Sequence, residues 1–120
     1  MMLRFWKKRR EEDPEAALRR GDHDAAVAAY RRAAQRAPDQ AARWQRKVAE
    51  TLAMAGRTPE AVRAYLEAAR LHERDERPLQ AIALYKAALR LSPGHPEATA
   101  RLEEYAPASE ERRGGTESSE

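Results

Sequence analysis

One helical pattern occurs three times in this chain of 120 residues, and its spacing limits the folds that the chain can adopt. The copies read AVAAYRRAAQRAP at 26–38, AVRAYLEAARLHE at 61–73 and AIALYKAALRLSP at 81–93. Each has an Ala, a Tyr four positions later, and a second Ala three positions after the Tyr. Apolar residues at this spacing form one face of an α-helix. Because one such helix cannot bury its apolar face alone, neighbouring helices must stack on each other.

Pro, Gly and Asp residues fall between the apolar stripes and predict where the helices begin and end. Asp13 followed by Pro14 is typical of a helix start, and Gly21 and Gly56 are typical of helix ends. The predicted helices are 14–20, 23–37, 40–55, 59–75, 78–91 and 96–105. No stretch alternates with a period of two residues, so we predict no strands.

The composition favours the same all-α fold class. Ala supplies 26 of the residues, and Leu, Arg and Glu are also frequent; all four are strong helix formers. We predict a basic, amphipathic N-terminal segment at 1–13, a domain of five to six helices at 14–105, and a polar tail at 106–120. The tail has no apolar residue larger than Ala, so we expect it to be disordered, and both termini to be flexible.

The repeated pattern resembles the tetratricopeptide repeat, a pair of antiparallel helices of roughly 34 residues that stacks into a solenoid. The positions that match the second helix of the family, and that we predict to form the repeat core, are Ala26, Tyr30, Ala33, Ala61, Tyr65, Ala68, Ala81, Tyr85 and Ala88. Trp44, Val48, Ala49 and Leu52 match the first helix in residue type, with Trp44 one place early. The resemblance covers about 14–105.

The unequal spacing of the copies predicts that one helix serves two repeats. The first two copies begin 35 residues apart, which is a full helical hairpin, and the last two only 20 residues apart, which is one helix and a turn. Helix 59–75 therefore closes one repeat and opens the next. Helix 96–105 then acts as a terminal cap.

The resemblance implies a protein-binding scaffold or adaptor whose first helices line a groove for a peptide or helix of another protein. By position, the groove residues would be Arg43, Trp44, Lys47, Glu50, Thr51 and Met54. Family members that hold the C-terminal carboxylate of a chaperone use Lys and Asn, and this sequence has no Asn. Arg43, Arg46 or Lys47 would be a looser substitute. Since about two and a half repeats are marginally stable alone, we also expect an exposed face to pack on a second copy or a larger partner.

The basic residues at the N-terminus leave an alternative function open. Residues 1–10 contain Phe5 and Trp6 followed by KKRR. This pattern fits a segment that binds the surface of an anionic membrane, or an arm that binds nucleic acid. Acidic residues follow at once and weaken the positive field, and the two aromatic side chains could instead fold back on the first helix. The net charge of the whole chain is only +3, which is not that of a nucleic-acid polycation.

The residue types needed for catalysis or metal binding are scattered or missing. The sequence contains no Cys, its three His residues are far apart without an HExxH pattern, and no Gly-rich loop is present. The pair Glu103 and Glu104 lies on a polar stretch, where solvation is the ordinary role. We therefore predict no enzyme activity, no cofactor and no metal. The lack of Cys and of a long apolar run fits the cytoplasm, and the abundance of Ala and Arg is typical of a GC-rich bacterial genome.

Overall fold

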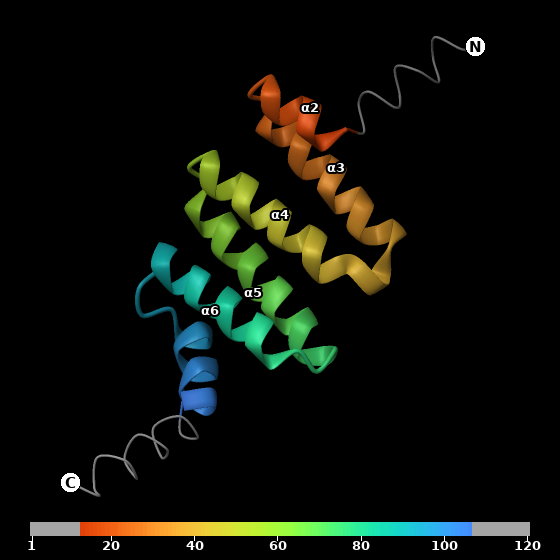
Figure 1. The fold of residues 1–120 in the computed structure, drawn as a ribbon. Helices are drawn as coiled ribbons and strands as arrows, with labels where there is room; N and C mark the ends of the chain where they lie inside the picture. The colour runs from red at the N-terminus through yellow and green to blue at the C-terminus, as the bar shows by residue number, and fades with distance from the viewer. Residues whose placement is uncertain (1–12, 107–120) are drawn as a thin grey trace, which may run out of the picture.

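The computed structural model describes residues 13–106, and all regular structure in this range is helical (Figure 1). In order, the elements are α2 (Pro14–Arg19), α3 (His23–Arg36), the short 3-10 helix η1 (Pro38–Gln40), α4 (Ala41–Met54), α5 (Thr58–Arg74) and α6 (Pro78–Leu91). A further helix spans 96–106, at the end of the described range, and is called the terminal helix below. The all-α class is confirmed, and each predicted helix agrees with an observed one to within about one residue at either end.

The first two helices begin at Asp residues that cap their free backbone N–H groups. The Oδ1 atom of Asp13 accepts hydrogen bonds from the backbone N–H groups of Glu15, at 3.1 Å, and Ala16, at 3.4 Å. The Oδ1 atom of Asp22 accepts one from Ala25 at 3.0 Å. These bonds satisfy donors that have no partner inside the helix, which fixes where each helix starts.

Three turns share one geometry, and they mark the point where each copy of the repeated pattern begins. Gly21 and Gly56 have φ angles of +76° and +77°, and Glu76 takes the same left-handed conformation with a φ of +58°. In each turn the next backbone N–H bonds to a carbonyl five residues earlier, for example from Arg77 to His72 at 2.8 Å. This closure is typical of a helix that ends on a left-handed residue. The turn from α5 to α6 is therefore equivalent to the turn within each helical hairpin.

The helices stack in the order of the sequence, each packing on the next (Figure 1). Helix α3 packs on α2 and α4, and α5 packs between α4 and α6. A stack in which contacts join neighbouring elements is the arrangement of a helical solenoid. The place of α5 agrees with the double role that the 20-residue spacing predicts.

The interior consists of two adjoining apolar clusters. The first lies among α2, α3, α4 and α5 and includes Tyr30, Val48 and Leu52; the second lies among α5, α6 and the terminal helix and includes Leu66 and Tyr85. Ala residues let the helix axes come close, and each Tyr ring fills the space that remains. Because Tyr65 packs against both clusters, the two form one continuous core.

Seven of the nine predicted repeat-core residues are buried, and two are not. The buried ones are Ala26, Tyr30, Ala61, Ala68, Ala81, Tyr85 and Ala88. Ala33 is only half-buried, because it lies in the second half of α3 and the six-residue α2 is too short to cover it. Tyr65 is also half-buried, because one side of its ring faces a groove described below.

Candidate protein-binding grooves

Four of the predicted groove residues follow one face of α4. Arg43, Lys47, Glu50 and Met54 are three or four residues apart, the spacing that aligns side chains along a helix. Arg43 and Met54 are exposed, Met54 with 61% of its surface free. The ammonium of Lys47 lies 3.9 Å from the carboxylate of Glu50, and both side chains are half-exposed. All four side chains are therefore accessible to a partner.

The other two predicted groove residues have structural roles. The Trp44 ring stacks on the Tyr30 ring of α3, with the centroids 6.0 Å apart, and the Arg43 guanidinium lies 5.3 Å from the centroid of the Trp44 ring. Thr51 is 1% exposed, and its hydroxyl donates a hydrogen bond of 2.8 Å to the carbonyl of Lys47. Placing Thr51 in the groove was wrong, because it lies three residues after Val48 on the buried stripe of α4.

A first hollow opens between α4 and α6, with α5 as its floor, and is called the α4–α6 groove. Its volume is about 260 Å³, and its lining residues are Arg46, Glu50, Tyr65, His72, Gln80, Ala83, Leu84, Ala87 and Arg90. Of the six predicted groove residues, only Glu50 lines it. Because Ala83 and Ala87 have small side chains, they leave the space between α4 and α6 unfilled on the α6 side.

Charges from both walls of this groove act on the hydroxyl of Tyr65. Burial raises the pKa of Tyr65, and the nearby Glu50 carboxylate raises it further, whereas the Arg90 and Arg46 guanidinium groups oppose this shift. Arg46 belongs to α4 and Arg90 to α6, so cations on opposite walls share one space. The contact from Arg46 to Glu50 is 3.8 Å long and half-exposed. A pair of this kind contributes little to stability, so it exchanges readily for another partner.

Three polar groups of the α4–α6 groove lack hydrogen-bond or ion-pair partners within residues 13–106. No ion pair joins the Arg90 guanidinium to another described residue, and no hydrogen bond joins the Tyr65 hydroxyl to one. The Nδ1 atom of His72 is buried without a partner. Burial, followed by the charge of Arg77, lowers the pKa of His72, which favours the neutral form of its ring. The groove therefore offers donors to a ligand and holds one carboxylate, from Glu50.

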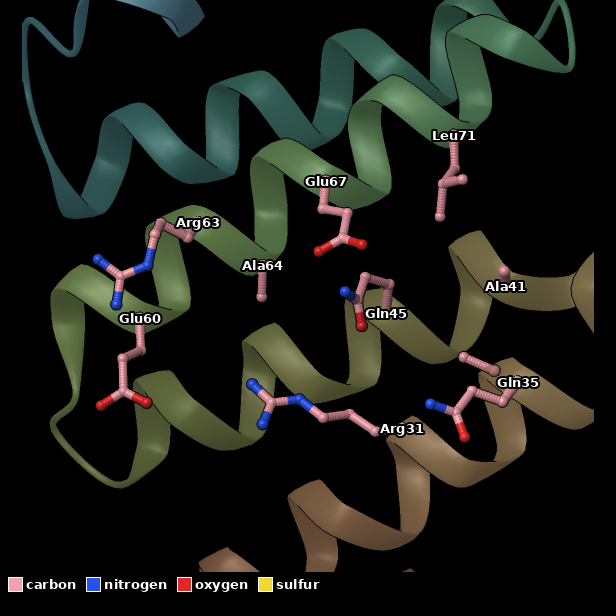
Figure 2. Close-up of a pocket in the computed structure, with 10 residues that line it drawn as sticks. Arg31, Gln35, Ala41, Gln45, Glu60, Arg63, Ala64, Glu67 and Leu71 are labelled. Atoms are coloured by element: carbon pink, nitrogen blue, oxygen red, sulfur yellow. The ribbon is translucent and has the colours of Figure 1, made fainter.

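A second and larger hollow, the α3–α5 groove, has a volume of about 560 Å³ and has α4 as its floor (Figure 2). Its lining residues are Arg31, Ala34, Gln35, Ala41, Gln45, Glu60, Arg63, Ala64, Glu67 and Leu71. In Figure 2, Glu67 of α5 and Gln45 of α4 point toward each other across the hollow. Two Arg and two Glu side chains balance the charge of this groove.

The sequence did not predict the α3–α5 groove, because its walls come from two helices that are not neighbours in the chain. Its depth depends on how far apart α3 and α5 lie across α4, and no local pattern encodes that distance. A partial signal exists: Arg31 and Gln35 are four residues apart on α3, and Glu60, Arg63 and Glu67 are three and four apart on α5. Such spacing predicts a shared face for each set, but it does not predict that the two faces meet.

A comparison with protein-family models matches the tetratricopeptide repeat to residues 15–76 and again to 45–96. Together the two matches cover more than half of the chain. This chain belongs to the tetratricopeptide repeat family. Repeats of this family are generally protein–protein interaction modules and typically non-enzymatic scaffolds. The two matches overlap across most of α4 and all of α5. A search of curated proteins found no match.

The three His side chains of this tetratricopeptide repeat protein are on separate elements. His23 begins α3, His72 lies in the last turn of α5, and His95 directly precedes the terminal helix. Among the described residues, no group of three or more His, Cys, Asp or Glu side chains is placed to hold a metal ion. In the same range, no helix has both the length and the apolar character needed to span a bilayer.

The two predicted terminal segments of the tetratricopeptide repeat protein lie outside the described residues, apart from Asp13 and Ala106. The alternative function through residues 1–10 also falls there. It stays a prediction of the sequence, as does the disorder of the predicted tail 106–120 beyond Ala106, the residue at which the terminal helix ends.

Proposed function

We propose that this tetratricopeptide repeat protein is a scaffold or adaptor that docks a peptide or helix of another protein in the α4–α6 groove. The observation that carries the proposal is the charge of that groove, in which the guanidinium groups of Arg46 and Arg90 face the carboxylate of Glu50 alone. A hollow that combines apolar lining with a few convergent polar groups is the usual form of a binding site, and here the uncompensated positive charge and the Tyr65 hydroxyl supply those groups. The accessible α4 face from Arg43 to Met54 continues this surface beyond the hollow itself.

The α4–α6 groove is a better candidate than the larger α3–α5 groove because of its charges. On α5, Arg63 lies three residues from Glu60 and four from Glu67, a spacing at which exposed side chains pair transiently in solution. The α3–α5 groove can therefore satisfy most of its own charges. In the α4–α6 groove, Arg46 and Arg90 face Glu50 alone, which leaves an excess of positive charge.

Binding at this site needs little ordering of the backbone. Both walls and the floor are helices packed on one core, so the groove exists before the partner arrives. Preformed sites lose less conformational entropy on association, and more of the contact energy remains as affinity. We expect the interaction to take place in the cytoplasm.

Affinity capture from the cells that express the protein tests this proposal with two matched variants. Ala83→Trp places a large ring in the α4–α6 groove, at an exposed position where it does not disturb the core. Gln35→Trp does the same in the α3–α5 groove. We expect proteins captured by the parent chain to be lost with Ala83→Trp and retained with Gln35→Trp. The reverse pattern would move the binding site to the α3–α5 groove.

A second copy of the chain is another expected partner, because the stack is short. Sedimentation at high micromolar concentration tests this expectation, and a strictly monomeric, stable chain would contradict it.

A further inference from the structure

The terminal helix is the last element of the stack, and polar contacts with α5 hold both of its ends (Figure 1). Near its start, Glu97 accepts hydrogen bonds from Arg70. Further along, Arg101 and Tyr105 donate hydrogen bonds to the carboxylate of Glu73. The surface of α5 and α6 that carries Arg70 and Glu73 is called the terminal-helix site below. This site fits a helix that presents an acid, an Arg and a Tyr at intervals of four residues.

The apolar contact between the terminal helix and its site is small. Ala98 is the one fully buried residue of the described part of this helix, and Leu102 and Tyr105 are half-buried against the second apolar cluster. Elements with few buried apolar contacts open locally at a lower free energy than the core does. The terminal helix therefore leaves its site more readily than α5 separates from α6.

An empty terminal-helix site is unfavourable, so it selects a replacement of the same kind. The side chain of Glu73 is only 17% exposed, and two of its three hydrogen-bond donors, Arg101 and Tyr105, come from the terminal helix. Removing those donors leaves a largely buried carboxylate poorly satisfied. A second copy of this chain carries the matching helix, whereas a helix of another protein would have to reproduce its three polar residues at the same intervals.

The link between α6 and the terminal helix favours an open conformation. It consists of the four residues 92–95. Ser92 precedes Pro93 and His95 precedes Pro96, and a residue before Pro prefers an extended backbone. The turn that brings the helix back onto its own α5 and α6 instead requires Gly94 to take a left-handed φ of +80°. The closed link thus depends on one Gly, while both neighbouring dipeptides favour extension.

We propose that two copies of the chain exchange their terminal helices, so that Arg101 and Tyr105 of each copy bind Glu73 of the other. The inference rests on the expectation that a second copy is a partner, and it specifies the surface and the residues involved. Exchange of an identical element is a low-cost route to a dimer, because both sites are filled and their contacts are retained. Four extended residues span about 13 Å, so the C-terminal ends of the two α6 helices would lie close to a twofold axis.

Complementation between two charge-reversed full-length chains tests the exchange. Glu73→Arg and Arg101→Glu each place like charges at the terminal-helix site of a single chain. In a mixed dimer with exchanged helices, one site joins the two substituted residues, and the other keeps the parent pair. We expect native mass spectrometry of an equimolar mixture to show at least about tenfold more heterodimer than homodimer of either variant.

A substitution in the link tests the same exchange without altering the site. Gly94→Ala penalises the left-handed closed turn but not an extended link, and no atom lies within 4 Å of the added Cβ. Because each dimer contains two links, we expect the dissociation constant of the dimer, measured by sedimentation, to fall at least about tenfold. The control is Gly56→Ala, which meets the same backbone penalty in a hairpin turn and should not strengthen the dimer. This variant decides the question if the charge-reversed chains do not fold.

The possible results separate the exchange from the other proposals. A parent chain that dimerises, with no heterodimer in the mixture and no effect of Gly94→Ala, would place the association on another surface and overturn the exchange alone. If every chain stays monomeric at high micromolar concentration, the expectation of a second copy fails as well. Equal strengthening by Gly94→Ala and Gly56→Ala would also refute the exchange, since general destabilisation would then drive association. Ala83→Trp should leave the dimer unchanged, because Ala83 and Tyr85 lie on opposite sides of α6, so docking in the α4–α6 groove is tested independently.

Discussion

The hydroxyl of Tyr85 donates a hydrogen bond of 2.7 Å to Oε1 of Glu73, which joins the middle of α6 to the end of α5. The other oxygen of the same carboxylate accepts a hydrogen bond of 2.7 Å from the Tyr105 hydroxyl and one of 3.1 Å from Nε of Arg101. Tyr105 and Arg101 belong to the terminal helix. One carboxylate thus holds three helices together. Arg70 adds a second link, donating from Nε to Oε2 of Glu97 at 2.7 Å.

Removing the Tyr85 hydroxyl should measurably destabilise the protein. Tyr85 is fully buried, and Tyr85→Phe keeps the ring but leaves the Glu73 carboxylate with one donor fewer. We expect a loss of about 1.5–3 kcal/mol in the free energy of unfolding, the usual range for a hydrogen bond to a charged group. Tyr85→Ala should cost about 3–5 kcal/mol, because a cavity opens as well. Denaturant melts measure both, and a Tyr85→Phe variant as stable as the parent would contradict the structural role of this bond.

Acid should weaken the attachment of the terminal helix. Burial would raise the pKa of Glu73, but the hydrogen bonds from Tyr85, Tyr105 and Arg101 outweigh it and hold that pKa below the ordinary value of 4.5. The hydrogen bond from Arg70 likewise lowers the pKa of Glu97. Because the unfolded chain binds these protons more readily, the stabilisation is present above pH 4.5 and is lost as the pH falls through the lowered values.

Thermal melts between pH 7 and pH 3 test this dependence, with Glu73→Gln as the comparison. The variant should be less stable at pH 7 and should lose less stability on acidification, because the group that titrates is absent. If the two profiles run parallel, Glu73 is not a source of the pH dependence.

Replacing Glu76 with Gly should stabilise the protein. Glu76 has a φ of +58°, a left-handed conformation that strains residues with a Cβ atom, whereas the equivalent positions of the other two turns are Gly21 and Gly56. We expect Glu76→Gly to raise the free energy of unfolding by about 1 kcal/mol. The matched control is Gly56→Ala, which should cost about 1–2 kcal/mol although no atom lies within 4 Å of the added Cβ. If Gly56→Ala stabilised the protein, the left-handed backbone conformation would not be what determines which residue is most stable at these turn positions.

Enlarging an Ala at the contact between α5 and α6 should disturb the stack. Ala68 is 0% exposed and belongs to the second apolar cluster. The larger side chain of Ala68→Leu forces the helices apart, at a cost of about 1–3 kcal/mol. Ala28→Leu, at an exposed position of α3, should change stability by no more than about 0.5 kcal/mol. Circular-dichroism melts compare the two, and equal effects would mean that close packing at Ala68 is unimportant.

The helices and their stacking order could be predicted from the sequence because local signals encode them. Pro14, Gly21 and Gly56 mark helix ends through their backbone preferences, and the repeated Ala and Tyr residues mark the apolar face. The 20-residue spacing predicted the double role of α5. The turn at Glu76 supports that interpretation with the geometry of a hairpin turn, although no Gly marks the position in the sequence.

The grooves and the polar network could not be predicted, since they depend on distances between helices. Trp44 is one place early relative to the family pattern, and one residue turns a helical side chain by about 100°; its ring stacks on Tyr30. Glu73 meets Arg101 across 28 residues of sequence, and no local pattern relates the two. The α4–α6 groove likewise requires α4 and α6, which are separated in the sequence by α5, to line one hollow.

Site-specific photocrosslinking in the cells that express the protein tests the central claim most directly. A photoreactive amino acid replaces Ala83 in one variant and Gln35 in another, which places the probe in the α4–α6 groove or in the α3–α5 groove. The account predicts a discrete crosslinked protein from position 83 and none from position 35. A crosslink from position 35 alone would contradict it.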